Sequence, residues 1–299
     1  MKNTDQLKNN SASQSIAIFG LLFGAFCWGI IWFPYRLMAE AGMAGAASSF
    51  YTYSIAIMIA GIYFAKHWRG IFELPLSIVF LGVVAGWTNL AYVLAVIDGE
   101  VMRVMLLFYL SPLWTLILAH FWLKEKTSVK GYVAIAVSLL GAFVMLYNPK
   151  VSSLPLPRNT AEWLALSAGI GFSLTNVLTR QSTHLSVRAK SFAVWVGVLA
   201  MSLAYILLSN EVFPNPHTLT MTNWMVMIII AILLLAATVL VQYGVTKIPA
   251  TRASVIFLFE LVVAAIASYY LAHEVMALNE WVGGSLIVLA AIFAASEQS

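Results

Sequence analysis

The chain has 299 residues, of which 62% are hydrophobic and 9% are charged, and its mean hydropathy is +0.90. Soluble domains of average composition carry about 25% charged residues. This composition therefore excludes a water-soluble globule, a fibre, a disordered chain and a disulfide scaffold. The remaining class is an integral membrane protein. Its apolar runs are continuous over roughly 20 residues, which favours helices that cross a hydrocarbon core of about 30 Å over a β-barrel.

Motifs for chemistry are absent from the sequence. The single cysteine, Cys27, lies in the first apolar run and cannot form an internal disulfide. There is no CxxC, HExxH, GxSxG or nucleotide-binding loop, so we predict no catalytic residue, no metal site and no cofactor. The chain is accordingly predicted not to be an enzyme.

Ten apolar runs follow a polar, lysine-bearing segment at residues 1–15. Ten spans of about 20 residues use roughly 200 positions, so the connections are short and no soluble domain fits between them. We therefore predict an all-α integral membrane protein with ten transmembrane helices. The runs lie at 16–38, 46–65, 76–97, 101–122, 129–147, 162–183, 188–209, 222–246, 252–272 and 280–296.

Lys and Arg residues are distributed unequally between alternate loops. Loops rich in these residues stay in the cytoplasm, so the distribution predicts a cytoplasmic tail at 1–15 and both termini in the cytoplasm. It also explains the formal net charge of +4 without a nucleic acid partner. Twelve basic residues fall on the predicted cytoplasmic side, namely Lys2, Lys8, Lys66, Arg69, Lys124, Lys126, Lys130, Arg180, Arg188, Lys190, Lys247 and Arg252, and four on the other, namely Arg36, Arg103, Lys150 and Arg158.

The two halves of the chain share a spaced pattern. Residues 103–125 match residues 252–274 at an offset of 149, and residues 28–36 match residues 172–180 at an offset of 144. The matched positions are Arg103 with Arg252, Phe108 with Phe257, Ser111-Pro112 with Glu260-Leu261, Glu125 with Glu274, Trp28-Gly29 with Phe172-Ser173, and Arg36 with Arg180. Because each half holds five spans, an odd number, the halves must be inserted upside down to each other, as in many secondary transporters.

This pattern predicts a first five-helix repeat at 16–147, a linker at 148–161 and a second five-helix repeat at 162–296. Trp28-Gly29, "SPLWTLILAHFWLKEK" from Ser111 and "FELVVAAIASYYLAHE" from Phe259 carry a family resemblance. Over essentially its whole length the chain resembles the EamA-type branch of the drug/metabolite transporter superfamily. The resemblance implies ten spans in two inverted five-span repeats, and similarity to bacterial exporters of aromatic amino acids and other metabolites. Leu261 departs from the family, where a second proline is common.

Polar and aromatic residues near span centres mark a predicted substrate cavity, since polar groups within lipid are costly and serve helix packing or a water-lined path. Thr88 and Tyr92 are four residues apart and therefore share a helix face. Interhelical hydrogen bonds are the alternative for each residue, and an interfacial aromatic belt is the alternative for Trp32 and Tyr92. The predicted substrate-binding residues are Trp28, Trp32, Trp87, Thr88, Asn89, Tyr92, Tyr109, Ser111, Asn176 and Gln242.

Glu260 is the acid predicted to lie deepest in the membrane. It follows Arg252 by eight residues, about 12 Å along a helix, which is close to the middle of a core of about 30 Å. We predict that it acts as a proton-coupling acid or anchors a substrate ammonium; the alternative is a carboxyl bonded to a neighbouring helix. Arg180 is predicted as a gate, although such arginines commonly snorkel. Pro112 is predicted as a helix bend that serves alternating access or simply kinks the helix.

Together with the resemblance, these features predict a multi-pass secondary active transporter of the bacterial inner (plasma) membrane. It is expected to move a small amphiphilic metabolite by alternating access, with export as the expected direction. An amino acid is favoured, and among amino acids an aromatic one. The predicted partners are this small-molecule substrate and the lipid bilayer, with a monomer sufficient for transport. The alternatives are a carrier of a nucleoside, sugar phosphate or drug-like cation, a lipid-modifying membrane enzyme, and a scaffold or sensor. The enzyme would need convergent acids or histidines at one depth, and a sugar phosphate carrier would need paired basic residues deep in the spans.

Overall fold

The computed structural model describes residues 2–43, 45–64, 75–99, 101–147, 157–209, 219–271 and 277–296, and the elements formed by these residues are all helices. The all-α prediction is confirmed for this part of the chain. Six helices are long and apolar enough to cross a membrane, and shorter apolar stretches lie at Ser111–Leu123, Val129–Met145 and Trp281–Ala294. The exact count of ten crossings remains a prediction. Glu274 and most of the predicted linker 148–161 lie outside the described residues.

Each predicted apolar run coincides with one helix or with one interrupted helix. The helices are α1 (Lys2–Glu40), α2 (Gly45–Phe64), α3 (Leu76–Asp98), α4 (Val101–Phe108), α5 (Ser111–Leu118), a π-helical turn (Ala119–Leu123), α6 (Val129–Leu146), α7 (Thr160–Gln181), α8 (Val187–Ser209), α9 (Met221–Lys247), α10 (Ala250–Phe257), α11 (Phe259–Leu271) and α12 (Leu278–Ser296). The predicted fourth run is divided into α4, α5 and the π-helical turn, and the predicted ninth run into α10 and α11.

Short polar side chains define where several helices begin. The Asn159 side chain accepts a hydrogen bond from the Glu162 backbone N–H at 2.9 Å at the start of α7. Ser128 accepts one from the Gly131 N–H at 3.0 Å at the start of α6. These caps satisfy backbone donors that the first helical turn leaves without partners.

The two interrupted helices break at corresponding positions. Helix α4 ends at Phe108 and α5 begins at Ser111, while α10 ends at Phe257 and α11 begins at Phe259. Phe108 and Phe257 are the residues that the 149-residue offset aligns. The first break lies directly before Pro112, whereas the second has Leu261 at the aligned position. Proline alone therefore does not explain why both helices are broken.

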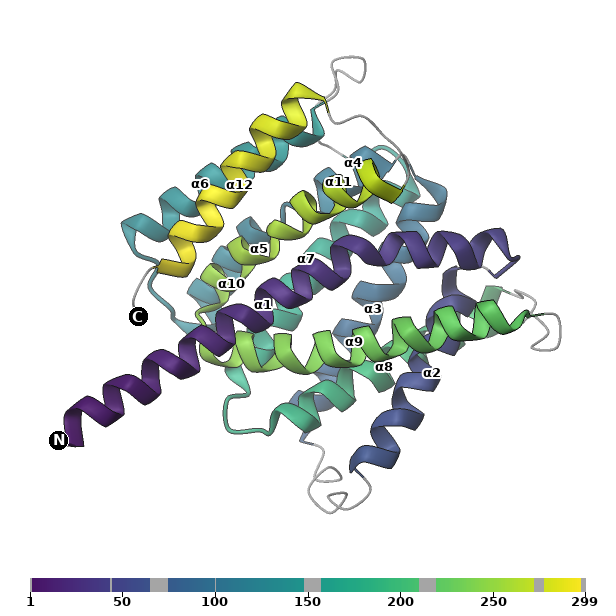
Figure 1. Cartoon of the computed structure of the whole chain (residues 1–299), viewed down its shortest axis with the longest axis horizontal. Coiled ribbons are helices and arrows are strands. Elements are labelled where there is room, and N and C mark those ends of the chain that lie inside the picture. The colour runs from purple at the N-terminus through teal and green to yellow at the C-terminus, as the bar shows by residue number, and fades with distance from the viewer. Residues whose placement is uncertain are drawn as a thin grey trace.

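Helix pairing relates the two halves of the chain. Helix α1 packs along α9, α3 packs along α7 and α8, and α6 packs along α12. Counting each interrupted helix as one gives ten helices, in which α1 and α9 are the first and eighth, and α7 and α3 are the sixth and third. The contact between the first and eighth helices thus has its repeat-related counterpart in the contact between the sixth and third. Figure 1 shows α6 beside α12 at one edge and α1 crossing the face of the bundle near α9. This is the pairing that two structurally equivalent halves would make, and their inverted insertion remains a prediction.

Small residues allow some helices to approach at backbone distance. Gly82 on α3 faces Gly197 on α8, and a Cβ atom at Gly197 would overlap the Gly82 carbonyl oxygen. Close contact through small residues is typical of helix pairs within membranes, where van der Waals packing replaces the hydrophobic effect. The Lys2 end of α1 and the Ser296 end of α12 lie on the same side of the bundle (Figure 1).

Candidate functional site

Four aromatic rings from four helices pack against one another, and together they are called the aromatic centre here. They are Trp28 on α1, Phe108 at the end of α4, Phe172 on α7 and Phe257 at the end of α10. Phe172 lies 5.7 Å from Phe108 and 5.2 Å from Phe257 between ring centroids. Trp28 lies 6.1 Å from Phe172 and 5.6 Å from Phe257. Tilted and edge-on pairs at these separations are attractive beyond the area they bury.

These four aromatic residues are two pairs of repeat-related positions. The offset of 144 aligns Trp28 with Phe172, and the offset of 149 aligns Phe108 with Phe257. The helix breaks place Phe108 and Phe257 at the carboxyl ends of α4 and α10. The aromatic centre therefore joins both predicted repeats and both breaks at one point.

The backbone at each break contacts a small residue on a neighbouring helix. At the first break, the Ser173 hydroxyl donates to the Ser111 carbonyl at 2.8 Å, in addition to its bond with the Gly169 carbonyl at 2.9 Å. At the second, Gly29 lies against the Glu260 carbonyl, which a Cβ atom at Gly29 would approach to 2.8 Å. Gly29 and Ser173 are themselves repeat-related. The breaks are thus held by interhelical contacts that follow the same register.

Glu260 lies in the first turn of α11, next to the aromatic centre, and its side chain is half-buried. The Tyr109 hydroxyl donates a hydrogen bond to its carboxyl group, and Tyr92 interacts with it electrostatically. Tyr92 and Tyr109 both contact Phe108, at 4.8 Å and 5.3 Å between ring centroids. The arrangement is a carboxyl group bordered by phenols and aromatic faces, which suits a cation attached to an apolar body.

Other predicted site residues divide between buried and surface positions. Asn89 Oδ1 and Asn176 Nδ2 are buried and have no hydrogen-bond partner within the described residues. Thr88 donates to the Val84 carbonyl at 2.8 Å and lies against Gly171, so it serves the contact between α3 and α7. Buried polar atoms without a partner are rare because each costs desolvation energy.

Within the described residues, the side chains that interact with Glu260 are Tyr109 and Tyr92, not Trp87 or Trp32. Trp87 is 40% exposed and continues the exposed stripe of α3 formed by Phe80 and Val83. Trp32 is half-buried, one helical turn beyond Trp28, and packs edge-on against Phe33 at 5.7 Å.

A second polar cluster lies where α7, α9 and α10 meet, at the end of the bundle that the charge pattern assigns to the cytoplasm. The Arg180 guanidinium donates to the Glu125 carboxylate at 2.9 Å and to the Thr246 carbonyl at 2.6 Å. The other oxygen of Glu125 accepts from the Ala250 N–H at 3.1 Å, at the start of α10. The predicted gate residue Arg180 is thus one part of a contact that joins three helices to the end of the π-helical turn.

The same cluster contains a buried lysine. Lys190 on α8 is fully buried and donates to the Thr179 carbonyl at 3.2 Å and to the Thr246 hydroxyl. The Thr179 hydroxyl donates to Gln242 Oε1 at 2.9 Å. Gln242, predicted to bind substrate, therefore bonds to α7 within this cluster. From the sequence, Lys190 supports only the predicted topology, and neither it nor Thr179 or Thr246 is placed in a site. A lysine three residues into an apolar run was a usable signal for one.

Local backbone geometry brings Glu125 to Arg180. The π-helical turn at Ala119–Leu123 ends at Lys124, which adopts the left-handed conformation with φ of 56°. π-helical turns and left-handed non-glycine residues both concentrate at functional sites. The Glu125 N–H then bonds back to the Ala119 carbonyl at 3.2 Å.

Comparison with known proteins shows that the chain belongs to a transporter family. The model of a family described as the EamA-like transporter family matches residues 15–147 and 159–296. An uncharacterized transporter, YojE, of Bacillus subtilis (strain 168) is 20% identical over 260 residues, covering 83% of this chain and 82% of that protein. An uncharacterized transporter of Clostridium kluyveri is 24% identical over 192 residues, covering 62% and 60%. A crystal structure matches with a TM-score of 0.76 at 15% identity, covering 94% of this chain and 96% of that one, which shows a shared fold.

Proposed function

Because the chain belongs to the EamA-like transporter family, we propose that it is a secondary active carrier of a small amphiphilic metabolite that works by alternating access. The favoured substrate is an amino acid with an aromatic side chain, moved outward across the bacterial inner membrane. The observation that carries this proposal is the Glu260 carboxyl group bordered by Tyr109, Tyr92 and the aromatic centre. The membrane and transport assignments follow from the family, whereas substrate, direction and mechanism are our proposal.

The chemistry around Glu260 supports recognition of an ammonium group. A carboxylate within a membrane requires a compensating charge or a proton, and a substrate ammonium supplies that charge. Phe108, Tyr92 and Trp28 add aromatic faces that attract cations and stack on an aromatic substrate ring. When no substrate is bound, a proton takes the place of the ammonium, so Glu260 is proposed to couple proton and substrate movement in opposite directions.

The two helix breaks supply a route for conformational change. The α10–α11 break sits at the base of Glu260, and the α4–α5 break sits at Tyr109. Half-helices can tilt about such breaks while their hydrogen-bonded ends stay intact. In the state described, the Arg180–Glu125 pair and the Lys190 bonds tie the predicted cytoplasmic end together. We propose that these contacts open when the carrier loads substrate from the cytoplasm.

A counterflow experiment tests this function without assuming a direction or a coupling ion. Proteoliposomes preloaded with unlabelled phenylalanine are placed in trace labelled phenylalanine, and we expect transient accumulation of label that protein-free liposomes do not show. Phenethylamine, which keeps the ammonium and the ring, should compete, whereas phenylpropionate, which keeps only the carboxylate and ring, should not. Competition by phenylpropionate alone would exclude an ammonium site at Glu260.

An organic cation without a carboxylate is a second candidate substrate. Within the described residues, the groups that interact with Glu260 are phenolic, and no basic side chain pairs with it. A site that binds the ammonium by charge but offers no cation for the carboxylate would accept a simple amine. Counterflow of labelled phenethylamine in the absence of phenylalanine counterflow would favour this candidate.

A further inference from the structure

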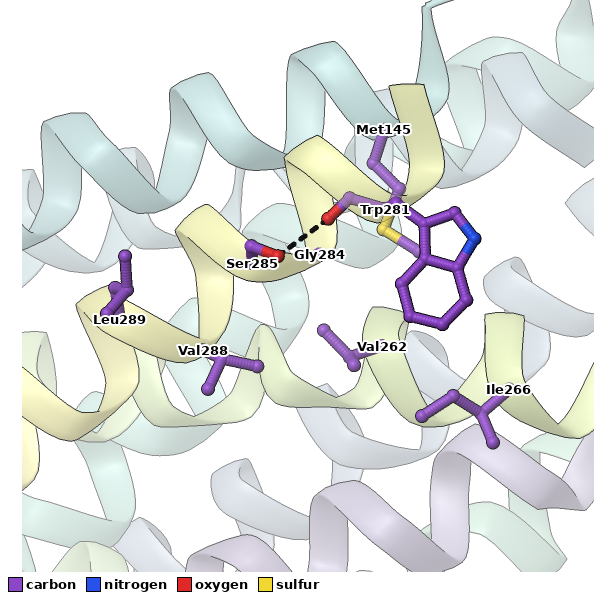
Figure 2. Close-up of a pocket in the computed structure, with 8 residues that line it drawn as sticks. All are labelled: Met145, Val262, Ile266, Trp281, Gly284, Ser285, Val288 and Leu289. Atoms are coloured by element: carbon purple, nitrogen blue, oxygen red, sulfur yellow. Dashed lines mark hydrogen bonds between the residues drawn. The ribbon is translucent and has the colours of Figure 1, made fainter. Parts of the chain in front are cut away.

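A pocket of about 370 Å³ opens on the side of the bundle between α11 and α12, with the end of α6 beside it (Figure 2). Val262 and Ile266 form the wall from α11, while Trp281, Val288 and Leu289 line it from α12. In Figure 2 the Trp281 indole and the Met145 side chain lie together at one end, and Leu289 lies at the other. Its lining residues include neither Glu260 nor any residue of the Arg180 cluster.

The lining of this pocket is mainly apolar, and its polar side-chain groups are the Ser285 hydroxyl and the Trp281 indole N–H (Figure 2). Ser285 is the hydroxyl residue among the lining residues, and its Oγ donates to the Trp281 carbonyl at 2.8 Å (Figure 2). The remaining side chains are aliphatic, aromatic or thioether groups. A polar metabolite would lose most of its hydrogen bonds with water here and gain few in return. An alkyl chain loses nothing and gains dispersion contacts.

The length of the pocket matches one leaflet of a bilayer. Trp281 and Leu289 are eight residues apart on one helix, about 12 Å along its axis. Half of a hydrocarbon core of about 30 Å is roughly 15 Å. Tryptophan near a helix end is typical of the membrane interface. The pocket therefore runs from an interfacial residue toward the middle of the membrane.

The pocket is continuous with the lipid-facing surface of α12. The side chains of Trp281 and Leu289 are each 60% exposed, and Ile292, in the next turn, is 61% exposed. We propose that this groove binds one acyl chain of a membrane phospholipid. The chain lies along α12 from Trp281 to Leu289, with its headgroup at the Trp281 end.

An acyl chain in the groove would contact the half-helix that carries Glu260. Val262 lies two residues after Glu260 and packs against the cluster that contains Phe108 and Tyr109. A bound chain therefore supports α11 from the lipid side, opposite the contacts it makes within the bundle. Removing the chain would loosen the position of α11 relative to α12.

The surroundings of two adjacent glycines show which of them can be replaced to fill the groove without disturbing the packing of α12 on α6. A Cβ atom at Gly283 would meet the Gly141 carbonyl and Met145 backbone at 2.5 Å, so Gly283 serves the packing of α12 on α6. A Cβ atom at Gly284 would meet only Val262 Cγ2 within 4 Å, at 3.8 Å, because it points into the groove. The substitution Gly284→Leu therefore fills the groove. Ala136→Leu, at an exposed position of α6 outside it, is the matched control.

Photolabelling of the full-length protein in bilayer nanodiscs tests the groove. The probe is a phosphatidylethanolamine with a diazirine midway along one acyl chain, and labelled residues are mapped by mass spectrometry. We expect Val262, Ile266 and Val288 to be labelled about tenfold more than the exposed α6 residues Val133 and Leu140, equivalent to a preference of ~1.4 kcal/mol. Gly284→Leu should abolish this excess, and Ala136→Leu should retain it.

Equal labelling of the groove and of α6 in the unmodified protein would overturn the proposal, whether or not Gly284→Leu folds. Unchanged groove labelling in a folded Gly284→Leu protein, as judged by its elution volume and thermal midpoint, would also overturn it. Because labelling is measured without transport, neither result depends on the proposed substrate.

Discussion

At the scale of single residues, Glu260 carries the largest share of the proposed chemistry. Its carboxyl group accepts a hydrogen bond from Tyr109, which lies at the break between α4 and α5. Because Glu260 follows the break between α10 and α11, this hydrogen bond links the two breaks. The sequence predicted a deep acid at this position from its distance to Arg252. It could not predict Tyr109 as the partner, because that contact joins residues 151 positions apart in the chain.

The Glu260→Gln substitution keeps the shape of the side chain and removes its ability to carry charge or exchange a proton. We expect counterflow of phenylalanine to fall by about 10- to 100-fold, since a hydrogen bond to a charged group is worth about 1.5–3 kcal/mol. The proton-driven component of uptake should disappear as well. Glu40→Gln, at an exposed carboxylate paired with Arg36, is the control and should transport normally. Unaltered transport by Glu260→Gln would contradict the assignment.

At the scale of secondary structure, the helix breaks depend on neighbours as well as on proline. The α10–α11 break forms with Leu261 where the α4–α5 break has Pro112. At the first break, the Ser173 hydroxyl satisfies the Ser111 carbonyl from a different helix. The sequence predicted a bend from Pro112 alone, and only packing reveals the second break.

Replacing Pro112 by alanine should therefore leave the break in place. We expect Pro112→Ala to keep its thermal midpoint within a few degrees and to retain most of the transport rate. Ser173→Ala should cost about 1 kcal/mol of unfolding free energy, because it removes an interhelical hydrogen bond within a buried region. Both are measured on purified protein by thermal unfolding and counterflow. A larger loss in Pro112→Ala than in Ser173→Ala would show that proline dominates.

The packing of α1 on α11 depends on Gly29. A methyl group there would lie 2.8 Å from the Glu260 carbonyl oxygen and 2.8 Å from Val263 Cβ, so the two helices would have to separate. We expect Gly29→Ala to lower stability by about 1–3 kcal/mol, the usual cost of overpacking, and to reduce transport. Gly284→Ala adds the same methyl group where there is room and should unfold at the temperature of the unmodified protein. Equal thermal midpoints for both variants would show that α1 and α11 are not tightly packed.

At the scale of the whole molecule, the described state is tied together at one end of the bundle. Glu125, Arg180 and Lys190 connect α7, α8, α9 and α10 there. Alternating access requires such a contact to form in one state and break in another. The relative stability of the two states should therefore respond to its removal.

Arg180→Gln should increase opening of this end. A partly exposed ion pair contributes about 1 kcal/mol, so we expect a roughly fivefold faster reaction of a buried cysteine with a membrane-impermeant maleimide. The cysteine replaces Ser191, which is fully buried next to Lys190, in a Cys27→Ser background. Lys247→Gln removes an exposed charge from the same end of α9 and is the control. Equal rates of maleimide reaction for Arg180→Gln and Lys247→Gln would contradict a role for Arg180 in gating.

The inverted insertion of the two halves has its own test. Repeat-related points at the ends of the fourth and ninth predicted spans, Lys126 and His273, should lie on opposite faces of the membrane. His273 is outside the described residues, and a reporter inserted there needs no structural assumption. Compartment-sensitive reporters at these two points should give opposite signals, and identical signals would exclude inverted repeats.

Composition and the spacing of apolar runs are sufficient to predict the class of protein and the positions of its helices. Continuous apolar runs of span length leave the backbone no alternative to helix in lipid, because every N–H and C=O must be satisfied within the segment. Repeat spacing also aligns Phe108 with Phe257, the residues at which α4 and α10 end. These are local properties, which depend on composition and spacing along one stretch of chain.

Tertiary structure alone decided which of the polar residues act together. The sequence grouped Gln242 with the substrate cavity, whereas its amide bonds to Thr179 within the cluster around Arg180. In the sequence Glu125 appears only as the repeat match of Glu274, whereas in the structure it forms an ion pair with Arg180, 55 residues away. Side chains that meet from different helices have no fixed separation in the sequence, so hydropathy and helical periodicity cannot predict which of them are in contact. Which polar groups meet is set by how the helices pack.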